Sequence, residues 1–159
     1  MALHLAVLRD WTFEPEVSFS IYGERGVIDI LGWHAAARVL LVIELKTEFV
    51  DINETMGTLD RKDRLAAVIA RERGWNPVAT GVWLVVAEGR TNRRALAAHS
   101  AVLRSKYPAD GRTVRGWLHR PVGRIQALSF LPHDVVVPLR SGTGAVGRAS
   151  RVRPRANPS

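Results

Sequence analysis

Alternating and continuous apolar positions in the first third of the chain predict three strands. Residues 16–22, EVSFSIY, alternate apolar and polar side chains, as a strand with one buried face does. Residues 27–33 and 38–46 are rich in Leu and β-branched residues, and the short segment HAAA lies near their junction, so a hairpin is the simplest connection. The two glycines of residues 23–26, GERG, predict a turn before the second strand.

The pattern changes to a helical period over residues 51–73. Asp51 is placed to cap the first turn together with Glu54, and Gly74 stands where a helix often ends in a left-handed residue. The apolar residues that recur on one helical face are Ile52, Met56, Leu59, Ala66 and Ala70. A long amphipathic helix therefore follows the third strand.

The second half of the chain predicts one buried strand, one helix and two shorter strands. Residues 77–88 include a continuous apolar run, which is typical of a strand covered on both faces. Asn92 is expected to cap a helix that extends to about Tyr107. Residues 114–119 and 125–131 have the composition of short strands.

These elements predict one mixed α/β domain followed by a basic tail. A short helix is expected to end near Leu8, which gives the order α-β-β-β-α-β-α-β-β. We place the domain at residues 1–139. Residues 140–159 contain Gly, Ser, Pro and Arg with little to bury, and are predicted to be disordered.

Composition narrows the possible chemistry and the possible partners. The 159 residues, 47% hydrophobic and 24% charged, are typical of one globular domain. No stretch is long and apolar enough for a membrane-spanning helix, and no N-terminal leader pattern is present, so we expect a cytoplasmic protein with no membrane partner. The absence of Cys excludes disulfides, thiolate metal sites and a Cys nucleophile. The net charge of +8 suggests a polyanionic partner.

Two acids and a lysine interrupt the apolar pattern of the predicted hairpin. A turn centred near residue 36 sets Asp29 opposite Ile43, or opposite Val42 or Glu44 if the register slips by one, so Asp29 and Glu44 are neighbours in each case. Two adjacent buried carboxylates are costly unless something positive lies beside them. Mg²⁺ or Mn²⁺ would remove this cost, and Lys46 would then lie beside the metal and an attacking water, an arrangement suited to phosphodiester hydrolysis. Alternatively, Glu-x-Lys is a common strand sequence with a structural role.

The segments GVIDIL and LLVIELKT, which carry these residues, resemble the PD-(D/E)xK nuclease superfamily, which includes archaeal Holliday-junction resolvases. The resemblance implies a restriction-endonuclease-like mixed central sheet flanked by helices. It also implies Asp29, Glu44 and Lys46 as the metal and catalytic residues. The superfamily usually supplies a further acid from its first helix, but residues 3–9 contain none, and Glu16 is the nearest substitute as a third ligand. Glu16 can equally be a solvated acid at a strand end.

A longer likeness points to one branch of that superfamily. The stretch from about residue 10 to residue 131, with PEVSFSIYGERGVIDILGW, GTLDRKDRLA and GRTNRRALAAH, resembles an uncharacterised branch often fused behind a helix-turn-helix domain in bacterial regulators. This chain has no such segment ahead of the predicted domain. The likeness therefore implies either a stand-alone or a truncated version of such a fused protein.

Several basic residues are candidates for contact with nucleic acid. Some lie on the predicted turn, others on the helix after the Glu-x-Lys strand, and others at the start of the helix near residue 92, where the helix dipole disfavours cations unless phosphate is present. These candidates are Arg25, Arg61, Lys62, Arg90, Arg93 and Arg94. For each group the alternative is an ordinary solvated surface.

Three functional hypotheses follow. The first is a Mg²⁺-dependent endonuclease acting on DNA, with a homodimer as one candidate assembly. The second is a non-catalytic DNA-binding or regulatory module with the same fold, whose binding should weaken steeply with salt. The third is an interaction domain for which the positive charge is incidental.

Overall fold

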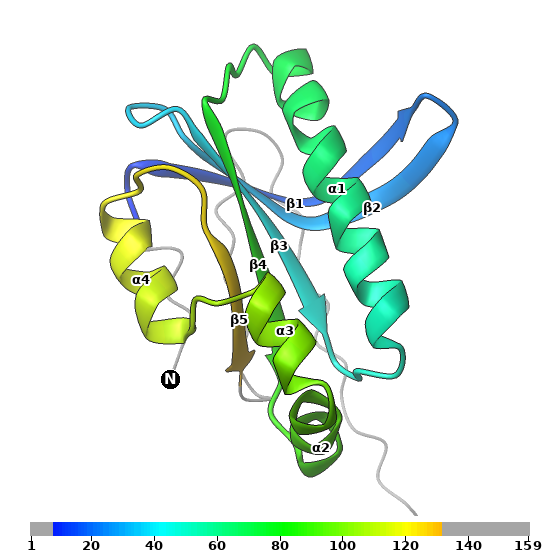
Figure 1. The fold of residues 1–159 in the computed structure, drawn as a ribbon. Coiled ribbons are helices and arrows are strands. Elements are labelled where there is room, and N and C mark those ends of the chain that lie inside the picture. The colour runs from blue at the N-terminus through cyan, green and yellow to red at the C-terminus, as the bar shows by residue number, and fades with distance from the viewer. Residues whose placement is uncertain (1–7, 132–159) are drawn as a thin grey trace, which may run out of the picture.

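The computed structural model describes residues 8–131 as an α/β fold built on a five-stranded mixed sheet (Figure 1). The strands are β1 (Trp11–Ile21), β2 (Glu24–His34), β3 (Val39–Lys46), β4 (Ala79–Ala87) and β5 (Gln126–Leu131). They lie in sequence order across the sheet. Neighbours β1, β2 and β3 are antiparallel, whereas β3, β4 and β5 run parallel to one another.

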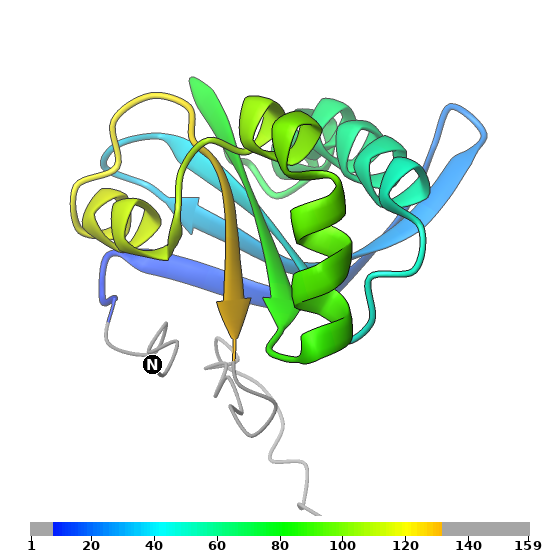
Figure 2. The ribbon, with the colours of Figure 1, turned by 60° about the horizontal axis from the view of Figure 1, so that its bottom comes forward.

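Four helices within the described residues connect and cover the strands. They are α1 (Ile52–Glu72), α2 (Arg90–Ala98), α3 (Ser100–Lys106) and α4 (Gly111–His119). Buried side chains of α1, α2 and α3 share one core with one face of the sheet, while those of α4 join a second core on the opposite face (Figure 2). The sheet is therefore covered on both faces, as expected for parallel strands.

The predicted β2–β3 hairpin and the helix after it are confirmed. Asp51 accepts a hydrogen bond from the backbone N–H of Glu54 at 2.9 Å, and so caps the first turn of α1. Beyond the end of that helix, Gly74 has a φ of +74°, which a glycine adopts at little cost. The first strand is longer than predicted, since it starts at Trp11 and residue 16 lies in its middle.

Two predictions for the second half were wrong. Residues 114–119 belong to helix α4 and not to a strand, because Asp110 caps that helix by accepting from the N–H of Thr113 and because Val114 and Leu118 pack on the sheet one helical turn apart. The helix expected from Asn92 to Tyr107 is divided into α2 and α3 at His99, and Asn92 lies inside α2.

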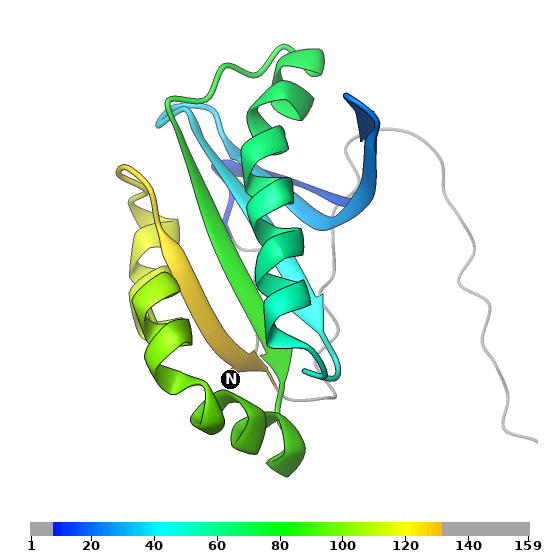
Figure 3. The same cartoon turned by 45° about the vertical axis from the view of Figure 1, so that its right-hand side comes forward.

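The β1–β2 hairpin changes faces halfway along its length. In β1, Phe13 packs in the α4-side core but Val17 packs in the α1-side core, although their spacing would place them on the same face of a regular strand. In β2, Ile28 and Leu31 both pack on the α1 side, although their spacing would place them on opposite faces. The far half of the hairpin consequently curves toward α1 (Figure 3).

The predicted strands at residues 77–88 and 125–131 are confirmed as β4 and β5, and two further predictions concern segments that the structure does not describe. The helix expected before residue 8 and the disordered tail expected from residue 140 both lie outside residues 8–131. Among the described helices, none combines the length and the apolar character needed to cross a membrane.

Candidate functional site at the end of the central strands

Glu44 lies near the end of β3, on the face that α1 covers. Leu40 and Val42 precede it at two-residue spacing and pack in the α1-side core, so strand alternation directs Glu44 to the same side. Its residue is 3% exposed. A carboxylate that is this buried requires charge compensation inside the protein or from a ligand.

Two lysines supply that compensation. Lys62 of α1 donates from Nζ to Glu44 Oε2 at 2.5 Å, and the Lys62 side chain is 6% exposed. Lys46 Nζ lies 3.2 Å from Glu44 Oε1, with its side chain 32% exposed. Both carboxylate oxygens therefore face an ammonium group, one deeply buried and one open to solvent.

Asp29 meets the same strand end through the backbone. The β2–β3 ladder pairs Ile30 with Ile43, and this register sets Asp29 level with Glu44. The sequence predicted Asp29 opposite Ile43, with Glu44 as one of the two alternatives after a slip of one residue. The Asp29 Oδ2 atom accepts from the N–H of Leu45 at 2.7 Å. Because the described β2–β3 pairing stops at Ile43, this carboxylate takes up a backbone donor where β2 leaves β3.

Asp29, Glu44, Lys46 and Lys62 form what we call the carboxylate–lysine cluster. The two acids and two ammonium groups sum to zero formal charge. The cost of placing two acids together, which suggested a metal from the sequence, is thus offset in this structure by the lysines.

Glu16 is exposed and lies level with Asp29 one strand further out, between the pairs Pro15–Ile30 and Val17–Ile28. Its φ of +50° is uncommon for a residue with a side chain, and it marks the position where the hairpin changes faces. Two strand spacings, about 10 Å, separate the backbones of Glu16 and Glu44.

The donor set determines how a metal could be held. Within residues 8–131 no group of three or more acidic or histidine side chains is arranged to hold an ion, so Glu16 does not complete a three-ligand set. Mg²⁺ is commonly held by one or two carboxylates with waters and phosphate oxygens. An ion in that minimal arrangement would bind Asp29 and Glu44 Oε1, because Glu44 Oε2 is engaged by Lys62, and it would share Oε1 with the Lys46 ammonium 3.2 Å away.

The other candidate basic residues are spread over the fold. Arg25 is exposed on β2 near the hairpin turn, and Arg61 is half-buried on α1. Lys62 lies in the carboxylate–lysine cluster instead of on the outer helix surface. Arg90 and Arg94 are exposed at the start of α2.

Arg93 is also exposed at the start of α2, but it has an acidic partner. Its Nε and Nη2 bind Glu88 at 2.5 and 2.7 Å. These hydrogen bonds raise the pKa of the Arg93 guanidinium and lower the pKa of the Glu88 carboxyl. The acid just before the helix therefore offsets the unfavourable placement of Arg93 near the positive end of the helix dipole.

Asn92 is a structural centre inside α2, whereas the sequence predicted that it caps a helix. Its side chain is buried in α2, where Oδ1 accepts from the N–H of Phe49 and Nδ2 donates to the carbonyls of Thr47 and Ala87, all between 2.8 and 3.0 Å. It thereby joins the chain after β3 to the end of β4. An Asn among arginines at a helix start gave a capping signal but no indication of these distant partners.

Comparison of the chain with models of protein families, with curated proteins and with solved structures found no match.

Proposed function

We propose that this domain binds nucleic acid through residues 88–131, which we call the arginine-rich segment and which comprise α2, α3, α4 and β5. The observation that carries the proposal is a separation of charge within the fold. Residues 8–87 contain nine basic and twelve acidic residues, whereas residues 88–131 contain nine basic and two acidic residues, a net charge of +7. A cluster of cations on one part of a fold is the electrostatic signature of a polyanion-binding protein.

The two acids of this arginine-rich segment are already engaged. Glu88 binds Arg93, and Asp110 accepts from the N–H and the hydroxyl of Thr113, which lowers the pKa of the Asp110 carboxyl. Arg90 and Arg94 are exposed and form no ion pair with another described residue. Phosphate groups at the start of α2 would meet these arginines together with the backbone N–H groups of the first helical turn.

Fluorescence anisotropy with labelled single-stranded, duplex and branched DNA of the same length, measured between low and moderate salt, tests this proposal. The double variant Arg90→Gln/Arg94→Gln should bind more weakly and should lower the slope of log affinity against log salt by roughly two. The matched control is Arg9→Gln/Arg71→Gln, which removes two exposed charges from the other part of the fold. Equal losses in both double variants would refute a defined interface on α2.

A second candidate function is Mg²⁺-dependent cleavage of DNA at the carboxylate–lysine cluster. Two contacts support it. The Asp29 carboxylate accepts a hydrogen bond from the N–H of Leu45, next to Glu44, and the partly exposed Lys46 ammonium lies 3.2 Å from Glu44. Asp29 and Glu44 would hold the ion, and the ion would polarise a phosphate and lower the pKa of a bound water. Lys46, the partly exposed cation of the cluster, would contact a phosphate oxygen.

Binding of Mn²⁺ tests this second candidate independently of substrate. Titration into the wild-type protein, monitored by water-proton relaxation, should show one site that Asp29→Asn removes. Cleavage of the three DNA forms with Mg²⁺ or Mn²⁺ should then be lost in Glu44→Gln. An unchanged Mn²⁺ affinity in Asp29→Asn, or cleavage that persists in Glu44→Gln, would exclude this centre.

A further inference from the structure

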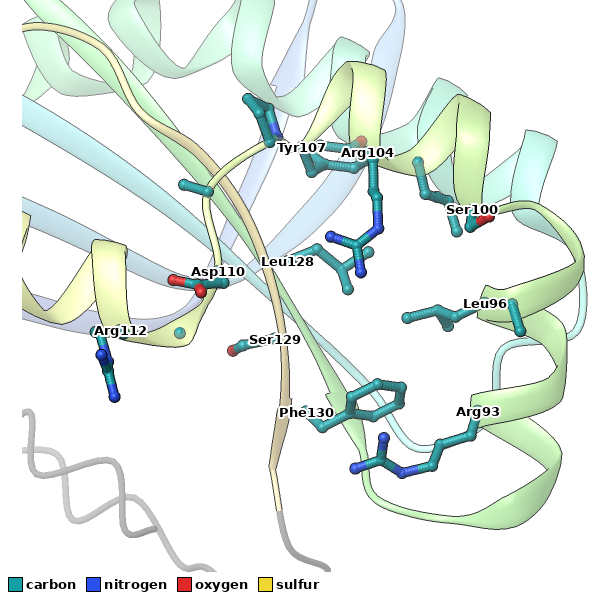
Figure 4. A pocket seen from close by; sticks show the side chains of 15 residues that line it. Arg93, Leu96, Ser100, Arg104, Tyr107, Asp110, Arg112, Leu128, Ser129 and Phe130 are labelled. Carbon is teal, nitrogen blue, oxygen red and sulfur yellow. The ribbon is translucent and has the colours of Figure 1, made fainter.

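A pocket of about 480 Å³ lies between α2, α3, the start of α4 and β5 (Figure 4). It is separate from the carboxylate–lysine cluster, since none of the four cluster residues lines it. Its volume is within the range of about 300–1,000 Å³ that is typical of small-molecule sites.

The floor of the pocket is apolar. Leu96 of α2 and Leu103 of α3 are buried there, and Leu128 and Phe130 of β5 face them half-buried. The strand is at the edge of the described sheet, so no neighbouring strand contributes side chains beside these two on the outer side. Figure 4 shows the side chains of Leu96, Leu128 and Phe130 directed toward the same space.

The polar rim is dominated by arginine. Arg93 lies beside Phe130, with its guanidinium carbon 4.6 Å from the ring centroid, and Arg104 extends from α3 into the pocket (Figure 4). Arg112 stands further out, beyond Asp110. In the described part of the chain, neither Arg104 nor Arg112 makes an ion pair.

The acids near this rim do not neutralise it. Glu88 is engaged with Arg93, and the Asp110 carboxylate is directed to Thr113 at the start of α4. An apolar floor beside an arginine that lacks an acidic partner is complementary to a molecule with a hydrophobic body and one negative group.

We propose that this pocket binds a small organic anion, with its apolar body on Leu96, Leu128 and Phe130 and its charged group on Arg104. Sequence charge argues against the chain's own residues 132–159 as the occupant, because that segment contains five Arg and one acid. The shared chemistry is a carboxylate or a phosphate on an apolar group, and the two are distinguished by the probes below.

Three probes of the same shape test the proposal by ¹H–¹⁵N NMR titration of the full chain: 2-naphthoate, 2-naphthyl phosphate and the neutral 2-naphthalenemethanol. We expect at least one anion to shift the amides of Leu96, Leu128 and Phe130, and to bind about tenfold more tightly than the alcohol, because a charge-assisted hydrogen bond has that effect. The tighter of the two anions identifies the charged group.

Variants separate charge from shape. Arg104→Gln should reduce the affinity for the anion about tenfold and leave that for the alcohol unchanged, while Arg71→Gln on α1 is the matched control and should change neither. Ala97→Trp, at an exposed position that lines the pocket, should block all three probes.

Failure of every probe to shift these amides at millimolar concentration, or equal binding of anion and alcohol with no effect of Arg104→Gln, would overturn the proposal. The test does not depend on nucleic-acid binding. Binding of the naphthyl probes is measured in the absence of nucleic acid, so this proposal and the nucleic-acid proposal can fail separately.

Discussion

The carboxylate–lysine cluster and the α2–α3 pocket lie on the same face of one sheet, yet they handle charge in opposite ways. In the cluster, Glu44 has Lys62 and Lys46 as partners, and Asp29 binds a backbone amide. At the pocket, Arg104 has no acidic partner in the described chain, and the nearby acids are engaged elsewhere. The acids of the cluster have partners inside the protein, whereas Arg104 at the pocket can pair with an external anion.

This difference bears on where a ligand should be sought. Removing one partner of a buried acid leaves an uncompensated charge between β3 and α1, which strongly destabilises the fold. Exposed arginines contribute little to stability in isolation, and so they are more informative about binding. Changes in the carboxylate–lysine cluster should mainly alter the free energy of unfolding. Changes in the arginine-rich segment should mainly alter the affinity for a ligand.

The largest expected effect on stability is from Lys62→Met. This change leaves the Glu44 carboxylate buried with one partly exposed lysine, and we expect a loss of about 3–5 kcal/mol in the free energy of unfolding. Urea denaturation followed by circular dichroism would measure it. Lys106→Met removes the ion pair with Asp60, whose side chain is 60% exposed, and should cost less than about 1 kcal/mol.

A second change tests whether charge is the cause. In Lys62→Met/Glu44→Leu both members of the buried pair become apolar, and most of the lost stability should return. If the double variant is as unstable as Lys62→Met, the single loss reflects packing and the cluster is not held by charge.

Asn92→Ala should have the next largest effect. It leaves the N–H of Phe49 and the carbonyls of Thr47 and Ala87 without their described partner, in a buried place, and we expect a loss of about 2–3 kcal/mol. Asn53→Ala, at an exposed position on α1, is the matched control and should change stability by less than about 0.5 kcal/mol. A similar loss in both variants would show that Asn92 is not a structural centre.

Local signals were sufficient to predict the elements around the cluster. The β2–β3 hairpin followed from two apolar runs with a short junction, and α1 followed from its cap and its apolar period. The neighbourhood of Asp29 and Glu44 followed from pairing alone, and the observed register differs by one residue from the first choice. These features depend on residues that are close in sequence or directly paired.

The role of Lys62 had a signal that was not used. The buried face of α1 includes Thr55, Leu59, Lys62, Ala66 and Ile69, spaced alternately by four and three. This spacing places Lys62 on the apolar stripe, where a lysine needs an acidic partner. The prediction that Lys62 contacts nucleic acid, together with the basic residues beside it, did not take this requirement into account.

Other features had no usable local signal. Val114 and Trp117 give α4 a strand-like composition, and the cap at Asp110 with packing on the sheet decides for helix instead. The change of faces at Glu16 depends on a positive φ that no residue type in PEVSF indicates, since the segment contains neither Gly nor Asn.

A pH-dependent prediction concerns Tyr107, whose ring lines the pocket and whose hydroxyl is buried with no hydrogen-bond partner among residues 8–131. Burial, together with Asp60 and Asp63 of α1, raises the pKa of the Tyr107 hydroxyl above its usual value of 10.0. The unfolded chain loses this proton near pH 10 while the folded protein keeps it. The ionisation of Tyr107 therefore leaves the free energy of unfolding unchanged below pH 10 and lowers it as the pH rises further.

Tyr107→Phe removes this ionisation. Relative to the wild type, the variant should gain about 1.4 kcal/mol in the free energy of unfolding between pH 8 and pH 11. Tyr22→Phe is the control, because Tyr22 is 84% exposed and should show no such gain. Equal pH profiles for the wild type and Tyr107→Phe would mean that the hydroxyl ionises in the folded protein.

The smallest expected effect is at Glu16, and it decides whether this acid belongs to the cluster. A glycine tolerates the φ of +50° without strain, so Glu16→Gly should raise the free energy of unfolding by up to about 1 kcal/mol relative to Glu16→Ala, in which the strain remains. Mn²⁺ titration of both variants should match the wild type. If Mn²⁺ affinity falls equally in the two variants, the Glu16 carboxylate contacts the bound ion from two strands away. Glu16 would then belong to the metal site together with Asp29 and Glu44.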